Sequence, residues 1–216
     1  MSVATRFLIA DLRDRGVHLT PRGDRLGIQA PDGVLTESLR QELLARKADI
    51  MAALRVADMR AQLLAVADAE GIPAGVVVRM TDSDIEACFG LDADVLLSYV
   101  RAAQASAERE AGRVPPGDTA TAWCRRCGPI WTHPTIADMA PAVGGMPVVL
   151  ACPWCRLARA GKYVPRPTVT CVDCARFTRD TINPAGGAGA CHRGSHYPNQ
   201  RHHCRDFEPM NTEART

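Results

Sequence analysis

Two pairs of closely spaced cysteines constrain the C-terminal half of this chain more than any other feature. They stand as Cys124 and Cys127 in WCRRC and as Cys152 and Cys155 in CPWC, with 24 residues between the pairs. Two such pairs can bring four thiolates to tetrahedral geometry around one ion, and zinc suits soft sulfur ligands. Because four thiolates fill the coordination shell, the spacing predicts a structural rather than a catalytic zinc site. A redox dithiol at CPWC would leave the first pair unexplained.

A second set of four cysteines follows with a less regular spacing of two, 16 and 12 residues: Cys171, Cys174, Cys191 and Cys204. Three histidines adjoin this set and could replace one of its members: His192, His202 and His203. The ligand set is therefore four cysteines, which we favour, or three cysteines and a histidine. The segment has few aliphatic residues, so a metal ion must hold it in one shape, with Phe177 and Phe207 as apolar support. We expect two Zn²⁺ ions per chain.

Composition divides the chain into an acidic and a basic part. Residues 1–118 hold 14 Lys/Arg against 18 Asp/Glu, whereas residues 119–216 hold 12 against six, which sums to the net charge of +2. Eight of the nine cysteines lie in the basic part. Charged residues interrupt the apolar start of the chain and no apolar run reaches membrane-spanning length, so a cytoplasmic protein without a membrane partner is expected. In a reducing compartment, Cys-x-x-Cys pairs favour metal binding over disulfides.

The N-terminal part has the pattern of a helix, a hairpin and one or two further helices. Apolar residues recur at helical spacing from Phe7 to Leu12, and Gly16 stands where that helix would end. Two alternating runs, 17–20 and 25–30, flank a Pro-Arg-Gly-Asp turn. Thr36 is a suitable N-cap for the leucine-rich helix that follows.

The next segment, 58–113, is predicted to be a helical connector without chemistry. Thr81 and Asp84 have capping-box spacing, and an Ala-rich helix stops near Gly112. Cys88 lies between Ala87 and Phe89 with no basic neighbour to activate it, so we interpret it as a buried small apolar residue.

The first 56 residues resemble a known family. The helix followed by Arg-Gly-Val, the polar hairpin, the APDGVLT entry and the helix ending in KADI are similar to the TubC-type N-terminal docking domain of bacterial peptide synthetase and polyketide synthase assembly lines. The resemblance implies an αββαα fold, often homodimeric, whose hairpin edge accepts a short peptide tail of a partner protein. The peptide-receiving positions that it implies are Arg25, Leu26, Gly27, Ile28 and Gln29.

The cysteine-rich half is similar to tails of TubC-docking-related proteins of proteobacterial mobile elements. The strings that carry this resemblance are GRVPPG, CGPIW, CPWC and DTINP. It implies an accessory role on an integrated element and names no biochemical activity.

These observations predict an α+β chain with a small αββαα docking domain, a helical connector and two small zinc-stabilised modules, one zinc-ribbon-like and one irregular. The expected divisions are 1–57, 58–113, 114–167, 168–210 and a disordered tail at 211–216.

Three functions from different classes fit this organisation. The leading hypothesis is a non-enzymatic adaptor that docks a peptide on its hairpin and uses its zinc modules for a second interaction. The alternative is a nucleic-acid-binding protein that uses the arginines of the basic half, although two zinc-thiolate sites would lower its net charge from +6 to about +2. The third is a His-Asn-His-type nuclease, for which the candidate residues are Asn199, His202 and His203. Stacking on nucleic-acid bases would fall to Trp123, Trp131, Trp154 and Tyr163.

Overall fold

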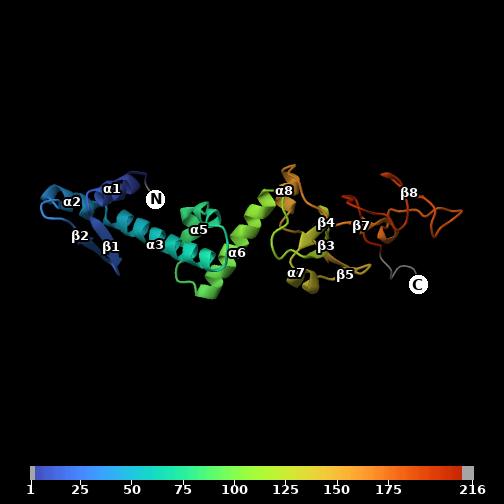
Figure 1. Ribbon diagram of the computed structural model, residues 1–216, viewed down its shortest axis with the longest axis horizontal. Coiled ribbons are helices and arrows are strands. Elements are labelled where there is room, and N and C mark those ends of the chain that lie inside the picture. The colour runs from blue at the N-terminus through green and yellow to red at the C-terminus, as the bar shows by residue number, and fades with distance from the viewer. Residues whose placement is uncertain (1–2, 211–216) are drawn as a thin grey trace. The chain divides into compact units, whose positions relative to one another are not determined.

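The computed structural model describes residues 3–210 and divides the chain into two compact units, 1–104 and 105–216 (Figure 1). The expected tail at 211–216 lies outside the described residues. Helices and small sheets alternate along the chain, which confirms the α+β class. No helix within 3–210 is both long enough and apolar enough to cross a lipid bilayer.

The first unit begins with the predicted αββαα order. Its elements are α1 (Val3–Asp14), β1 (His18–Arg22), β2 (Arg25–Gln29), α2 (Glu37–Ala45) and α3 (Lys47–Ala69). Thr36 caps α2 as predicted, its side-chain oxygen accepting from the Leu39 N–H at 3.3 Å. Leu12, Leu43 and Ile50 are almost fully buried in the core that the hairpin and the three helices share.

The helical connector follows without a break, because α3 continues through it. The further helices are α4 (Gly75–Val78), α5 (Asp82–Glu86) and α6 (Ala93–Glu110), which runs across the boundary between the units. Residues of α3 enter two cores: Ile50 and Leu54 pack with the hairpin, whereas Met59 and Leu63 pack with α4 to α6. One long helix therefore supplies the cores of both the docking fold and the connector.

Two details of the connector match the sequence analysis. Thr81 and Asp84 form a complete capping box at the start of α5. Cys88 is fully buried, and its Sγ donates to the Asp84 carbonyl at 3.3 Å. Burial raises the pKa of the Cys88 thiol, which keeps it protonated and unreactive.

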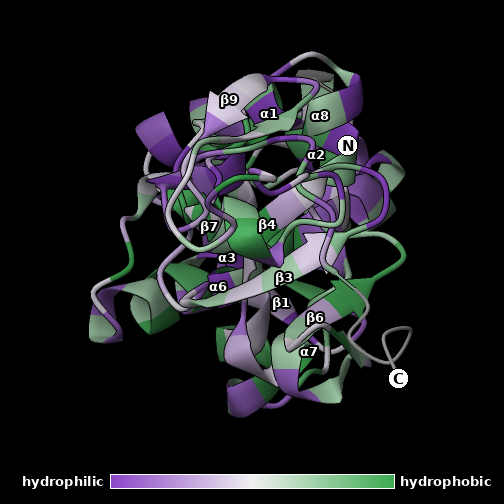
Figure 2. Ribbon diagram, turned by 90° about the vertical axis from the view of Figure 1, so that its right-hand side faces the viewer, coloured by the Kyte–Doolittle hydropathy of each residue, from purple (hydrophilic) through white to green (hydrophobic). Residues whose placement is uncertain are grey.

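The second unit is built on a four-stranded sheet of order β4-β3-β6-β5. Its elements are β3 (Ala120–Cys124), β4 (Gly128–Thr132), α7 (Pro134–Met139), β5 (Ala142–Val143), β6 (Met146–Val149) and α8 (Cys155–Arg159). The β3–β6 pair is parallel and the other two pairs are antiparallel. Ile130 on β4 is fully buried, and β4 shows a hydrophobic, green segment in Figure 2.

The rest of the second unit has little regular structure. Its elements are β7 (Val169–Thr170), the 3-10 turn η1 (Cys171–Asp173), β8 (Gly189–Cys191), β9 (Gly194–His196) and β10 (Arg201–His202). Phe207 is buried beside Val169 and Cys174, and Phe177 packs against the same cluster, as predicted. The Trp123 indole N–H donates to the Phe207 carbonyl at 2.8 Å and so ties this segment to β3.

Adjacent leucines on α2 provide a test of the first core. Leu43 is 2% exposed and Leu44 is 72% exposed, so the same truncation acts on two neighbouring positions with opposite burial. Leu43→Ala should lower the free energy of unfolding by about 2–5 kcal/mol, and Leu44→Ala by no more than about 0.5 kcal/mol. Urea unfolding followed by helical circular dichroism measures both. Equal effects of the two substitutions would contradict this packing.

Candidate metal centre

The first Cys-x-x-Cys pair lies in the turn between two paired strands. Cys124 ends β3, Cys127 precedes β4, and the Cys127 N–H donates to the Cys124 carbonyl at 3.3 Å. Gly128 follows with φ at +78°, and a Cβ there would overlap the Arg205 carbonyl oxygen, so the position requires glycine. The turn thus brings the Cys124 and Cys127 sulfurs within 4.8 Å of each other.

The second pair lies where β6 gives way to α8. Cys124 pairs with Val149 in the parallel register of β3 and β6, which brings the second pair to the first. Cys155 is the first residue of α8, and its N–H donates to the Cys152 carbonyl at 3.0 Å. The Cys152 N–H in turn points at the Cys155 sulfur, at 3.3 Å.

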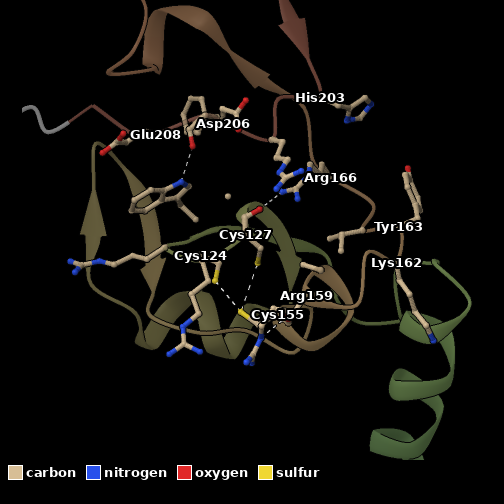
Figure 3. A pocket seen from close by; sticks show the side chains of 18 of the residues that line it. Cys124, Cys127, Cys155, Arg159, Lys162, Tyr163, Arg166, His203, Asp206 and Glu208 are labelled. Atoms are coloured by element: carbon tan, nitrogen blue, oxygen red, sulfur yellow. Dashed lines mark hydrogen bonds between the residues drawn. The ribbon is translucent and has the colours of Figure 1, made fainter. Parts of the chain in front are cut away.

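The four sulfurs of Cys124, Cys127, Cys152 and Cys155 converge within 4.8 Å of one another and can hold a metal ion. Figure 3 shows three of these cysteines meeting beside a cavity. The Sγ–Sγ distances are 3.6 Å for Cys124 and Cys155, 3.2 Å for Cys127 and Cys152, and 3.7 Å for Cys152 and Cys155. A tetrahedral ion with metal–sulfur bonds of about 2.3 Å requires sulfur separations of about 3.8 Å. The geometry fits one ion with four thiolate ligands.

Electrostatics show why a cation suits this cluster. A hydrogen bond from the Cys127 thiol lowers the pKa of Cys152 to about 6. The hydrogen bond to Cys152, together with burial, raises the pKa of Cys127. Burial also raises the pKa of Cys124. Burial thus disfavours the thiolate form at Cys124 and Cys127, and a divalent cation bound to the sulfurs would offset that cost.

Side chains around the centre fix its backbone. Trp154 is fully buried between the second pair of cysteines, and its indole N–H donates to the Trp131 carbonyl at 3.0 Å. The Arg109 guanidinium lies over the Trp154 ring at 5.8 Å and is paired with buried Asp118 at 2.8 Å. Trp154 is thus part of the core and is not available for base stacking.

The contacts of Arg166 with the first cysteine turn were not predicted from the sequence. The Arg166 guanidinium donates to the Cys127 carbonyl and, at 3.0 Å, to the Pro129 carbonyl, so it anchors the first cysteine turn from the loop before β7. Nothing in its local sequence signals this role, because the contact spans a sequence separation of 37 residues or more.

The second set of cysteines surrounds a separate small cavity. All four of its members line a space of about 20 Å³: Cys171, Cys174, Cys191 and Cys204. Burial raises the pKa of Cys171 to about 11, and the three other cysteines act in the same direction. The structure therefore brings the four predicted residues to one place, although more loosely than the first four.

The three candidate histidines have different surroundings. The Nδ1 atom of His202 lies 4.0 Å from the Cys171 sulfur, and its ring stacks on His196 at 5.0 Å. His192 also lines the small cavity but contacts Asp206 at 3.1 Å, whereas His203 lines a different, larger cavity. His202 is thus the histidine best placed to replace a cysteine ligand. Because His202 and His203 face different cavities, a shared nuclease site with Asn199 gains no support.

The predicted peptide-receiving residues all lie on β2 of the hairpin. Each of the five pairs with β1 in an antiparallel register. Leu26 packs into the core of the first unit, whereas Ile28 is 38% exposed. The Arg55 guanidinium donates to the Gly23 carbonyl at 3.1 Å and holds the hairpin turn against α3.

Comparison with known proteins defines the class of the N-terminal part. Residues 6–55 match the family model of the TubC N-terminal docking domain, which confirms the resemblance for this segment. A docking domain implies a protein partner. No curated protein and no solved structure matches the chain. The resemblance of the cysteine-rich half to proteins of mobile elements stays a prediction.

A cysteine substitution tests the first centre. Cys127→Ser removes one of the four converging sulfurs and should lower the bound metal by one ion per chain, since three thiolates hold the ion far more weakly. Cys88→Ser is the matched control, because Cys88 is buried in the other unit. Native mass spectrometry of the purified proteins gives the metal count, and an unchanged count for Cys127→Ser would contradict the assignment.

Proposed function

We propose that this protein is a non-enzymatic, zinc-binding adaptor. Its N-terminal docking domain receives a short peptide tail of a partner protein, and its C-terminal half, held by two zinc ions, makes a second interaction. The match of residues 6–55 to the TubC N-terminal docking domain carries this proposal. An open edge of the hairpin could bind such a peptide as an added strand.

The register of the hairpin decides which edge is suited to a peptide. Arg22 and Arg25 flank a two-residue turn that begins with Gly23 at φ +59°, and such a turn closes on a hydrogen-bonded pair. Pairs alternate along an antiparallel ladder, so Leu26 and Ile28 occupy non-hydrogen-bonded positions opposite Pro21 and Leu19. Their N–H and C=O groups therefore point away from β1.

The two outer edges of the hairpin differ in what they can donate. On β1 the outward-facing positions are Leu19 and Pro21, and proline has no N–H. On β2 both outward-facing positions, Leu26 and Ile28, keep their N–H groups. In the described part of the chain no third strand joins this sheet. Strand addition is thus favoured on β2, with the exposed Arg25, Ile28 and Gln29 side chains available for selectivity.

Ile28→Pro tests the docking edge without disrupting the hairpin. The substitution removes only an outward-facing N–H, because position 28 makes no ladder hydrogen bond to β1. Peptides selected from a random library on the full-length protein should lose about 10-fold or more in affinity, the equivalent of about 1.4 kcal/mol. Ile28→Val is the matched control and should retain binding. Fluorescence anisotropy with labelled peptides measures the affinities.

Two outcomes would count against docking on β2. One is equal affinity of the selected peptides for the Ile28→Pro variant and the wild type. The other is failure of the wild type, with its full metal content, to enrich any peptide from the library.

Zinc is the metal that the donor sets favour. Four thiolates at tetrahedral separations match structural zinc, and a second group of four cysteines lines a cavity of about 20 Å³, which suits a single ion. Bound zinc would supply folding free energy to a segment that buries few aliphatic side chains. With four protein ligands at each ion, neither zinc would keep an open coordination position for a substrate.

The second zinc site makes a prediction of its own. Cys204→Ser should lower the zinc count from two to one per chain, since it removes one of the four ligands that we favour. His202→Ala should leave two zinc ions, because His202 lies beside the site and is not counted among those ligands. The reverse pattern in native mass spectrometry, with loss only in His202→Ala, would establish a three-cysteine, one-histidine site.

The second candidate function is nucleic-acid binding by the C-terminal half. The observation that favours it is the basic lining of the large cavity beside the first metal centre. A role on a mobile genetic element belongs to this second proposal, whereas a cytoplasmic location and homodimerisation through the N-terminal domain are proposed independently of it. The domain limits 57, 113 and 167 also stay proposals.

A further inference from the structure

A cavity of about 800 Å³ opens on the second unit between the first metal centre and the C-terminal segment. Three stretches of chain form most of its walls, namely the first cysteine turn, α8 with the loop after it, and residues 203–208, and Arg176 adds to the lining. Figure 3 shows side chains that line this space, with Arg166 directed at Cys127 and with Lys162 and His203 on other parts of the rim. The cavity is distinct from the small space that the second cysteine set encloses.

Positive side chains dominate the lining of this cavity. There are seven of them: Arg125, Arg126, Arg159, Lys162, Arg166, Arg176 and Arg205. The acidic side chains that line it are Asp206 and Glu208. Seven positive charges, less two carboxylates and a net charge of −2 for a zinc ion with four thiolates, leave three positive charges. The cavity stays positive even after the metal centre is counted.

Carboxylates of the described chain do not neutralise three of these arginines. Glu208 is paired with Arg176 at 3.0 Å, and Asp206 is engaged by Arg193 and His192. Within residues 3–210, the exposed side chains of Arg125, Arg126 and Arg205 form no hydrogen bond or ion pair. Three residues that line one cavity thus keep their guanidinium donors free for an anion.

An aromatic side chain lies on the same cavity. Tyr163 is 72% exposed, although a tyrosine of a folded domain normally buries most of its ring. Its ring rests against Gly112, where a Cβ would approach Tyr163 Cδ1 to 3.3 Å. An exposed ring on the same cavity as residues with free guanidinium groups is the combination that binds unpaired bases together with their phosphates.

We propose that this cavity binds single-stranded nucleic acid, with Arg125, Arg126 and Arg205 contacting phosphates and Tyr163 stacking on a base. A single strand fits better than a duplex, because a duplex hides its base faces and α8, the helix on this cavity, has only five residues to enter a groove. It fits better than an acidic peptide, which offers carboxylates but no ring to stack. The inference deepens the second candidate function and is independent of peptide docking on β2.

The test uses the full-length, zinc-loaded protein and a labelled oligothymidine about 20 nucleotides long, which exceeds the usual site sizes of about 4–16 nucleotides. Fluorescence anisotropy across a salt series should show affinity that falls with salt, with a slope of about −0.7 for each phosphate contacted. The matched duplex should bind more weakly. A poly-glutamate peptide should compete poorly.

Charge-matched variants locate the binding site. Arg126→Ala with Arg205→Ala should weaken binding about 10-fold or more at low salt and reduce the salt slope by about 1.4. Arg179→Ala with Arg201→Ala removes the same charge from exposed positions outside the cavity and should change affinity less than about 3-fold. Tyr163→Ala should weaken binding while Tyr163→Phe preserves it. Zinc content is checked for every variant, because Arg126 adjoins Cys127.

Several results would overturn this inference. They are absence of salt-dependent binding by the wild type, equal losses in the two arginine pairs, tighter binding of the duplex, or preferential binding of poly-glutamate. Ile28→Pro should bind the oligothymidine as the wild type does, so this test is separate from the docking test. A protein that selects peptides but binds no oligothymidine keeps its docking function and loses this one.

Discussion

The convergence of four sulfurs at Cys124, Cys127, Cys152 and Cys155 is the constraint on which the second unit depends. The sheet beneath it is small, with strands of two to five residues, and its fully buried apolar side chains are few. Such a unit gains little free energy from burial relative to the entropy of ordering its chain. Ligation by an ion would add that free energy where aliphatic packing is scarce. The C-terminal segment contacts this sheet at β3 and at the turn before β4, so its position also depends on the four sulfurs.

Much of the first unit could be predicted from sequence because local signals determined it. The helix stop near Gly16, the N-cap at Thr36 and the capping box at Thr81 act over three or four residues and appear where expected. The sequence pattern allowed one or two helices after the hairpin, and it did not locate the break between α2 and α3 at Arg46, because the apolar face continues through that residue. The continuity of α3 across two cores was also missed, since periodicity does not reveal which partner each turn meets.

The sequence was enough to predict which residues form the candidate sites, but not which other residues surround them. Cysteine spacing alone identified the four sulfurs that converge, because the two short turns impose their own geometry. The parallel pairing of β3 with β6, the anchoring by Arg166 and the different neighbours of His192, His202 and His203 arise from contacts between distant segments. The basic cavity is of the same kind: its arginines are scattered along 80 residues and meet only in the fold.

Because α3 runs unbroken through two cores, the docking fold cannot be separated from the connector without cutting a shared helix. The family match ends at residue 55, near the middle of a helix whose next turns carry Met59 and Leu63 into the connector's core. Ion pairs from Arg6 and Arg60 to Asp82, at 2.6 and 3.3 Å, join α1 and α3 to α5. A gene fusion cut at the family limit would strip the connector of its central helix and expose apolar surface on both fragments. Inheritance as one cassette of about a hundred residues keeps both cores whole.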